Sequence, residues 1–129
     1  MVKLPVDRLR VLFVDDSLSV RKVAERMLAG IGVEVVTAVD GQDALEKLRA
    51  MQFSLVFTDL EMPRMHGYEL IREMQILPAY QAIPVVVISS RSGQKHIDQA
   101  ITMGAKEYLT KPFSPEILNA VLARLAKNK

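Results

Sequence analysis

The stretch LVFTD, residues 55–59, decides the fold of this chain, because four apolar or β-branched residues run directly into an aspartate. The stretch VLFVDD, residues 11–16, has the same arrangement and ends in two aspartates. A short, continuously apolar run is typical of a strand that is covered on both faces, as in a parallel sheet. In an open α/β sheet the ligand crevice lies just beyond the carboxyl ends of the strands. The sequence therefore predicts that Asp15, Asp16 and Asp59 share one crevice.

Short β-branched runs alternate along the chain with longer segments of helical periodicity. This alternation indicates βαβ units and therefore an α/β fold with a parallel sheet, here in five βα units. The expected strands are Val11–Val14, Val33–Ala38, Leu55–Thr58, Val85–Ser89 and Glu107–Leu109. The second and fifth are shorter or more polar than the others, which is typical of edge strands.

Apolar stripes at helical spacing follow the strands and predict the helices. Glycine suits the end of the first helix near residues 30–32, and Asp40 is a favourable N-cap for the second. Ser114 followed by Pro115 is a favoured pair at a helix start and opens the fifth. The stripes are formed by Val20, Val23, Met27, Leu28 and Ile31; Ala44, Leu45 and Leu48; Leu70, Ile71 and Met74; Ile97, Ala100 and Ile101; and Ile117, Leu118, Val121, Leu122 and Leu125.

The composition bounds the class of protein. The chain has 129 residues, of which 50% are hydrophobic and 25% charged, so we expect one globular domain over residues 1–129. The absence of cysteine excludes disulfides, thiolate metal sites and cysteine nucleophiles. The net charge of +2 is scattered apart from the tail at 127–129, so we expect no nucleic-acid binding. No apolar stretch approaches the roughly 20 residues that cross a bilayer, and no signal-peptide core is present, so we expect a cytoplasmic protein without membrane insertion.

The acidic crevice has the chemistry of a divalent-metal site. Mg²⁺ takes oxygen ligands and usually binds one or two carboxylates together with a phosphate. The carboxylates of Asp15, Asp16 and Asp59 carry about three negative charges, and one Mg²⁺ would reduce this to about one and keep the acids ionised. The sequence therefore predicts Mg²⁺ at this place. A solvated acidic turn is the alternative for residues 15–17, because Asp-Asp-Ser is also a good helix start.

A strand-end aspartate such as Asp59 can also accept a phosphoryl group and form a mixed anhydride. Phosphoryl transfer needs positioning and charge neutralisation more than covalent machinery. Lys111 follows the last expected strand and can pair with a phosphoryl oxygen, Ser89 offers a hydroxyl to the same oxygen, and a cis bond before Pro112 would aim Lys111 inward. Each residue also has an ordinary alternative, as a loop-starting aspartate, a surface lysine or a serine bonded to nearby backbone. Their joint placement at the ends of separate strands favours the chemical interpretation.

This set of motifs closely resembles the receiver domain of two-component response regulators. The matching elements are Val14–Asp16, Thr58–Pro63 with Gly67, Val85–Ser90 and Tyr108–Phe113, within a match from about residue 10 to the C-terminus. The resemblance implies a (βα)₅ doubly wound fold of flavodoxin-like strand order 2-1-3-4-5. In that order the first and third strands are neighbours, so the aspartates that follow them come together.

The resemblance also implies the chemistry of the site. Asp59 would be the phosphoacceptor, charged by a phosphohistidine on a histidine kinase or phosphotransfer domain. Asp16 and Asp59 would bind Mg²⁺ directly, Asp15 would help through water, and the backbone carbonyl of Glu61 would be a further ligand. Lys111 would pair with the phosphoryl group. Enzymatic activity is expected only in the sense that the domain catalyses its own phosphorylation and dephosphorylation.

A conformational switch is implied in the same way. Ser89 would turn toward the phosphoryl oxygen, and Tyr108 would move inward and reshape the surface of the fourth helix, fifth strand and fifth helix, where a downstream protein would bind. Ser89 stands where threonine is common in the family, and Glu61 and Met62 occupy positions that tune dephosphorylation. Residues 60–65 and 91–96 are similar to those of receivers at the C-terminus of hybrid chemotaxis-type histidine kinases.

Three other functions share parts of this pattern. A Mg²⁺-dependent phosphatase of haloacid-dehalogenase type also uses a strand-end aspartate and would take Glu61 as its second carboxylate, but the Asp15–Asp16 pair and Lys111–Pro112 fit it poorly. A flavin-binding flavodoxin-like module would need a phosphate loop rich in Ser, Thr and Gly after the first strand, and the sequence has none there. A receiver fold used only for docking would have no need of an intact Asp59 and Lys111.

Overall fold

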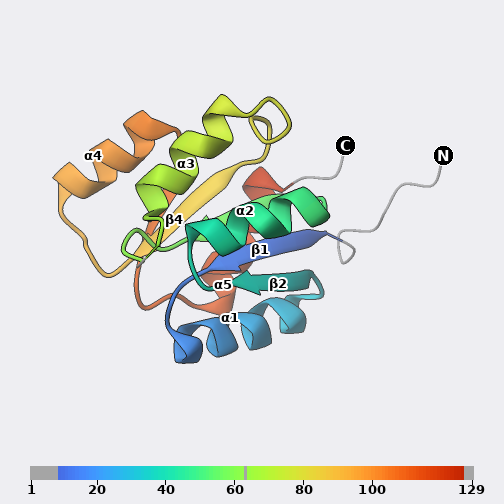
Figure 1. Cartoon of the computed structure of the whole chain (residues 1–129). Helices are drawn as coiled ribbons and strands as arrows, with labels where there is room; N and C mark the ends of the chain where they lie inside the picture. Colours follow the sequence, from blue (N-terminus) through green and yellow to red (C-terminus); the bar gives the residue numbers. More distant parts are fainter. Residues whose placement is uncertain (1–8, 63, 127–129) are drawn as a thin grey trace.

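The computed structural model describes residues 9–62 and 64–126. Within these residues, five parallel strands form one sheet in the order β2-β1-β3-β4-β5, which confirms the predicted doubly wound order (Figure 1). The strands are β1 (Arg10–Val14), β2 (Glu34–Ala38), β3 (Leu55–Thr58), β4 (Val85–Ser89) and β5 (Glu107–Thr110). The helices are α1 (Leu18–Ile31), α2 (Gly41–Ala50), α3 (Gly67–Ile76), α4 (Gln94–Met103) and α5 (Pro115–Leu125).

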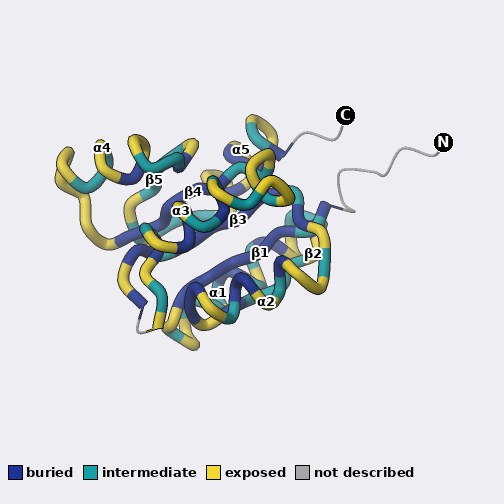
Figure 2. The backbone as a smooth tube through the Cα atoms, turned by 45° about the horizontal axis from the view of Figure 1, so that its top comes forward, coloured by how far each residue is buried: buried dark blue, intermediate teal, exposed yellow. Residues whose placement is uncertain are grey.

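Helices cover both faces of the sheet, and each face has its own apolar core. Alternate residues of β1 point to opposite faces, as a strand requires. Val11 and Phe13 pack in the core beneath α1 and α5, whereas Leu12 and Val14 pack in the core beneath α2, α3 and α4. Figure 2 shows the central strands as the most continuously buried part of the backbone, with exposed residues along the outer sides of the helices.

The edge strands are the two that the sequence predicts. Along β1, β3 and β4 nearly every residue is buried, whereas β2 and β5 contain exposed and half-buried positions. β2 starts at Glu34, one residue later than expected. The reason is that the Val33 N–H donates to the Leu28 carbonyl oxygen at 3.2 Å and belongs to the cap of α1.

The helix ends follow the capping rules. Gly32 ends α1 with a φ of 102°, a conformation that a residue without a Cβ adopts at no steric cost. The side chains of Asp40 and Ser114 accept the N–H groups of Asp43 and Ile117, at 2.9 and 3.2 Å, and cap α2 and α5 as predicted. In the part of the chain that the structure describes, no helix has the length and apolar character to cross a membrane.

Candidate functional site

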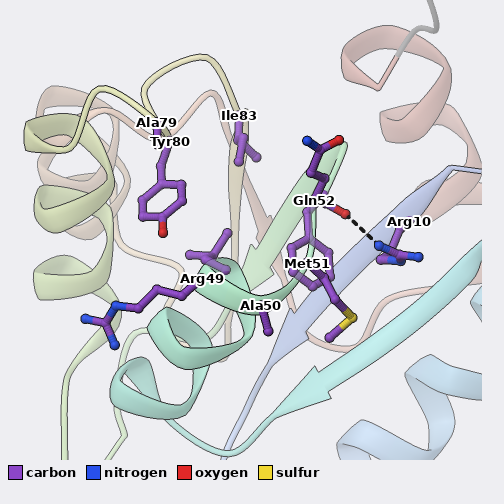
Figure 3. A pocket seen from close by; sticks show the side chains of 10 residues that line it. Arg10, Arg49, Ala50, Met51, Gln52, Ala79, Tyr80 and Ile83 are labelled. Atoms are coloured by element: carbon purple, nitrogen blue, oxygen red, sulfur yellow. Dashed lines mark hydrogen bonds between the residues drawn. The ribbon is translucent and has the colours of Figure 1, made fainter.

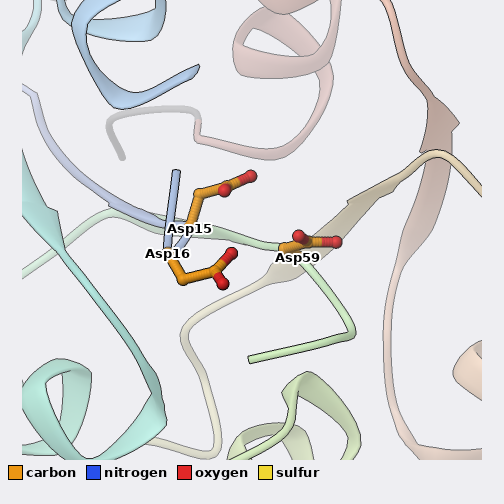
Figure 4. A group of neighbouring side chains, drawn as sticks. All are labelled: Asp15, Asp16 and Asp59. Carbon is orange, nitrogen blue, oxygen red and sulfur yellow. The ribbon is translucent and has the colours of Figure 1, made fainter. Parts of the chain in front are cut away.

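Three acidic side chains meet at the carboxyl end of the sheet. β1 pairs with β3 in parallel, with Val14 opposite Thr58, so the residues that follow these strands are neighbours. Carboxylate oxygens of Asp15, Asp16 and Asp59 lie within 4.8 Å of one another, and Figure 4 shows the three side chains gathered in one place. The Asp59 N–H donates to the Val14 carbonyl oxygen at 2.9 Å, which fixes the two strand ends together.

The three carboxylates differ in their surroundings. Asp15 is 1% exposed, and its Oδ1 accepts a hydrogen bond from the Ser17 N–H at 2.9 Å. Asp59 is half-buried, and its Oδ1 accepts from the Leu60 N–H at 2.8 Å. Asp16 is exposed. Because Ser17 itself caps α1, capping does not account for Asp16, and Asp15 uses only Oδ1 at the helix start.

Lys111 reaches this cluster from the end of β5. Its Nζ lies 2.9 Å from Oδ2 of Asp15 and 3.4 Å from Oδ2 of Asp59. Its side chain is only 22% exposed, and its N–H donates to the Ser89 carbonyl oxygen at 2.8 Å. The bond between Lys111 and Pro112 is cis. Because of its low exposure and its two carboxylate contacts, the Lys111 side chain does not lie free on the surface, which is the ordinary alternative for a lysine in this position.

The charges in the cluster do not balance. Burial, followed by the nearby charge of Asp15, raises the pKa of Asp59 above its ordinary value, although Lys111 acts in the opposite direction. Burial alone would lower the pKa of Lys111, but its hydrogen bond to Asp15 and the charges of both carboxylates outweigh burial and raise that pKa. Three carboxylates face one ammonium group, so the ionised cluster has a surplus of two negative charges. An all-oxygen donor set with this charge suits a hard divalent cation such as Mg²⁺.

The Ser89 hydroxyl lies at the end of β4 and is 2% exposed. Its Oγ accepts a hydrogen bond from the Arg91 N–H at 3.1 Å, so it contacts nearby backbone in this structure. A serine hydroxyl also carries one hydrogen, and that hydrogen remains available to another acceptor.

Arg91 joins the two residues of the predicted switch, and the sequence alone did not single it out. Its N–H bonds to Ser89, and its carbonyl oxygen accepts the Tyr108 hydroxyl at 2.6 Å. Its guanidinium also pairs with the carboxylate of Glu61. Arg91 lies in the stretch 91–96 that resembles hybrid-kinase receivers, but the sequence assigns it no role, because its contacts depend on how separate loops and strands face one another.

The loop after Asp59 is packed closely against the site. The Glu61 side chain is exposed and turned toward Arg91, whereas Met62 is 3% exposed and belongs to the core beneath α2, α3 and α4. Pro63 lies outside the described residues. A Cβ at Gly67 would lie 2.1 Å from the Asp59 carbonyl oxygen, so only glycine fits at this position without a shift of backbone.

Cavity volume does not locate the acidic cluster. A cavity of about 730 Å³ opens at the amino end of the strands, where Figure 3 shows Arg10 and Tyr80 on its walls, and none of the described residues that line it is acidic. Two smaller cavities, of about 350 and 390 Å³, flank the cluster at the carboxyl end. The first is lined by Lys111 and Phe113 beside α1, and the second by Glu61 and Arg91 between α3 and α4.

Known proteins match this chain in sequence and in fold. The family model for the response regulator receiver domain matches residues 11–123. Protein PilG of Pseudomonas aeruginosa is 38% identical over 120 residues, which cover 92% of this chain and 89% of PilG. Chemotaxis protein CheY4 of Vibrio cholerae is 33% identical, with a TM-score of 0.86 over 92% of this chain and 98% of CheY4. The receiver domain of sensor histidine kinase PA1611 from Pseudomonas aeruginosa, with a magnesium ion coordinated in its active-site cleft, is 24% identical, with a TM-score of 0.85 over 92% of this chain and 98% of that domain.

Some relatives are longer proteins. The match covers 50% of a probable transcriptional regulator from Cyanophora paradoxa and 32% of a protein-glutamate methylesterase/protein-glutamine glutaminase from Symbiobacterium thermophilum. These two matches cover 95% and 90% of this chain. This chain belongs to the receiver domain family of two-component response regulators.

Proposed function

We propose that Asp59 is the phosphoacceptor of this receiver domain and that a phosphohistidine on a histidine kinase or phosphotransfer domain is the donor. An Oδ of Asp59 would attack phosphorus, the bond between phosphorus and the histidine nitrogen would break, and an acyl phosphate would form on Asp59. The observation that carries this proposal is the contact of Lys111 Nζ with Asp59 Oδ2 at 3.4 Å. An ammonium group at that distance is placed to neutralise an oxygen of the incoming phosphoryl group.

A magnesium ion belongs to the same proposal. Asp15, Asp16 and Asp59, with the Glu61 carbonyl, would hold it, and the surplus of negative charge in the cluster supports this assignment. The PA1611 receiver domain, which has the same fold, holds magnesium in its cleft. When bound, the ion supplies positive charge that offsets repulsion between the carboxylates and the phosphoryl oxygens.

The output of phosphorylation would be a change at the surface of α4, β5 and α5. If the Ser89 hydroxyl turned toward a phosphoryl oxygen, the Arg91 N–H would lose its present acceptor. The Arg91 carbonyl is the acceptor of the Tyr108 hydroxyl, so a shift of Arg91 would also release the ring of Tyr108. These two bonds give the proposed switch a physical connection, and a downstream protein target would read the altered surface.

The donor protein would dock beside Lys111. The cavity of about 350 Å³ there is lined mainly by apolar groups, among them Val20, Val23 and Phe113. Leu18, at the start of the same helix, has 60% of its surface exposed, which is high for a large apolar side chain. Exposed apolar surface next to the acceptor suits a protein partner whose histidine must approach Asp59.

A haloacid-dehalogenase type of hydrolase is not supported. The family model and the relatives are those of receivers, and the Glu61 side chain, which would have to act as the general acid, is paired with Arg91. A role in chemotaxis-type signalling fits the match to chemotaxis protein CheY4. The cytoplasmic location and the single domain over residues 1–129 stay predictions.

Intact-mass spectrometry after incubation with Mg²⁺ and a small phosphodonor tests the proposal. We expect one added phosphoryl group on the wild-type protein and none on Asp59→Asn, because the amide is isosteric with the carboxylate but is no nucleophile. Omission of Mg²⁺ should remove the labelling of the wild-type protein. Equal labelling of Asp59→Asn would place the acceptor elsewhere and contradict the proposal.

A further inference from the structure

The loop between β3 and α3 is attached to the turn before α2 by a bidentate ion pair. Arg64 donates from Nε to Oδ2 of Asp40 at 2.6 Å and from Nη2 to Oδ1 at 3.2 Å. Asp40 is 3% exposed, and its Oδ1 also accepts the Asp43 N–H that caps α2. The carboxylate therefore links the rigid start of a helix to the loop.

Backbone contacts reinforce the same attachment. The Gly41 N–H donates to the Met65 carbonyl oxygen at 3.1 Å, next to the ion pair of Asp40 and Arg64. A Cβ at Gly41 would lie 2.5 Å from the Met65 side chain and 2.8 Å from its carbonyl oxygen, so the two segments are in close contact. The segment at Arg64 and Met65 therefore packs closely against the start of α2 and is also bound to it by the ion pair.

The attached loop is the one that directly follows Asp59 in the chain. It begins at Leu60 and Glu61, directly after Asp59, and returns at Gly67, whose N–H donates to the Leu60 carbonyl oxygen at 2.9 Å. The loop also makes an ion pair with Arg91 through Glu61, but both of those side chains are about half exposed, at 47% and 59%. Exposed pairs of this kind contribute little to holding a backbone in place. The Asp40 carboxylate is buried, so the pair of Asp40 and Arg64 should hold the loop more firmly than the pair of Glu61 and Arg91.

We propose that Arg64 is a positioning residue for the metal side of this site. By holding the Asp40 carboxylate with both donors, it would tie the segment that follows Asp59 to the start of α2, and in this way it would set the place of the Glu61 carbonyl, the proposed backbone ligand. This inference rests on the proposed function, since it assumes that the cluster binds Mg²⁺. Arginine suits the role because its planar fork makes two parallel hydrogen bonds, whereas lysine offers a single point charge.

Titration calorimetry with Mg²⁺ on the unphosphorylated protein, combined with amide hydrogen exchange in the absence of metal, tests this role. Arg64→Gln should weaken Mg²⁺ binding by about tenfold, the lower end of losses seen when groups that orient metal ligands are removed. The same variant should speed exchange at residues 60, 61 and 65. The Mg²⁺ affinity of Arg64→Lys should lie between those of the wild-type protein and Arg64→Gln, because lysine keeps the positive charge but lacks the two parallel donors of arginine.

Arg124→Gln is the matched control. Arg124 makes an equally bidentate pair with Glu107, at 2.8 and 2.6 Å, but joins α5 to β5 away from the acidic cluster. We expect normal Mg²⁺ affinity in Arg124→Gln. The thermal unfolding temperature should be lowered more by Arg64→Gln than by Arg124→Gln, because Asp40 is more deeply buried than Glu107, and both variants should remain folded at the temperature of the calorimetry. Unchanged affinity in Arg64→Gln, or an equal loss in Arg124→Gln, would overturn the positioning role while leaving the proposed function intact. A wild-type protein that binds no Mg²⁺ would overturn both.

Discussion

The two ends of the sheet differ in the charged side chains that gather there. At the carboxyl end, Asp15, Asp59 and Lys111 form a compact cluster of buried and half-buried charges that do not balance. At the amino end lies a cavity of about 730 Å³ with Arg10 and Tyr80 on its walls, and no acidic side chain is among the residues described there. Parallel pairing aligns the strand ends at both edges, so topology alone does not make a site. What the sequence places after each strand decides where unbalanced charge, and with it the chemistry, is found.

The largest expected effect is that of replacing Lys111, the lysine at the carboxyl end of the sheet. We expect Lys111→Ala to lower the free energy of unfolding by about 1–2 kcal/mol without metal, because buried Asp15 loses its cation. Labelling of Asp59 by a small phosphodonor should slow by roughly 100-fold, as when a donor to a developing anion is removed. Urea unfolding and timed intact-mass spectra measure the two effects.

Lys106→Ala provides the control for that substitution. Lys106 is exposed and lies at the amino end of β5, so its loss should change stability by less than about 0.5 kcal/mol and leave labelling normal. If Lys106→Ala and Lys111→Ala changed stability and labelling equally, the positive charge in the acidic cluster would not be what matters for either.

Asp59, the proposed phosphoacceptor, should reduce the stability of the metal-free protein. Because burial and Asp15 raise the pKa of Asp59, its contribution to stability is complete below the ordinary value of 3.8 and is lost as pH rises through the raised pKa. At pH 7 the ionised group is therefore unfavourable, and Asp59→Asn should stabilise the metal-free protein by about 1 kcal/mol. Thermal unfolding at pH 7 measures this gain. Mg²⁺ should raise the melting temperature of the wild-type protein more than that of the variant, and a less stable metal-free variant would contradict the charge argument.

The strands and the acidic cluster were predictable because each follows from local sequence. An apolar run such as Leu55–Thr58 is typical of a covered strand, and the parallel pairing of β1 with β3 brings Asp59 beside Asp15. The helix caps at Asp40 and Ser114 were predictable for the same reason, since each bonds to a residue three positions later. The strand order itself came from the family resemblance and is confirmed here.

The contacts between loops were not predictable from the sequence. Asp40 was expected to cap α2, and it does, but its pair with Arg64 joins residues 24 positions apart. Arg91 contacts Ser89 through backbone, Glu61 through its side chain and Tyr108 through its carbonyl oxygen. Such contacts depend on how surface loops face one another in space, and neither periodicity nor residue type records that arrangement.

Because of the pair of Asp40 and Arg64, we expect the free energy of unfolding to depend modestly on pH. The hydrogen bond from Arg64 is the main cause of the lowered pKa of Asp40, so its contribution to stability is present above the ordinary value of 3.8 and is lost as pH falls through the lowered pKa. Asp40→Asn keeps a favourable N-cap but removes the charge. We expect the variant to be less stable than the wild-type protein at pH 6, with a difference that shrinks toward pH 3. Urea unfolding across this range measures it, and a constant difference would exclude Asp40 as the titrating group.

The smallest effect should come from filling the cavity at the amino end. Ala50, the last residue of α2, is exposed and lines this cavity. Ala50→Leu should change the free energy of unfolding by less than about 0.5 kcal/mol, since leucine is a good helix former and the site is open to solvent. Because the acidic cluster lies at the opposite end of the strands, Mg²⁺ affinity and the rate of Asp59 labelling should change by less than about twofold. Calorimetry and timed intact-mass spectra measure both. A larger change in either would mean that the two ends are coupled through the strands, and the carboxyl end would no longer account for the chemistry by itself.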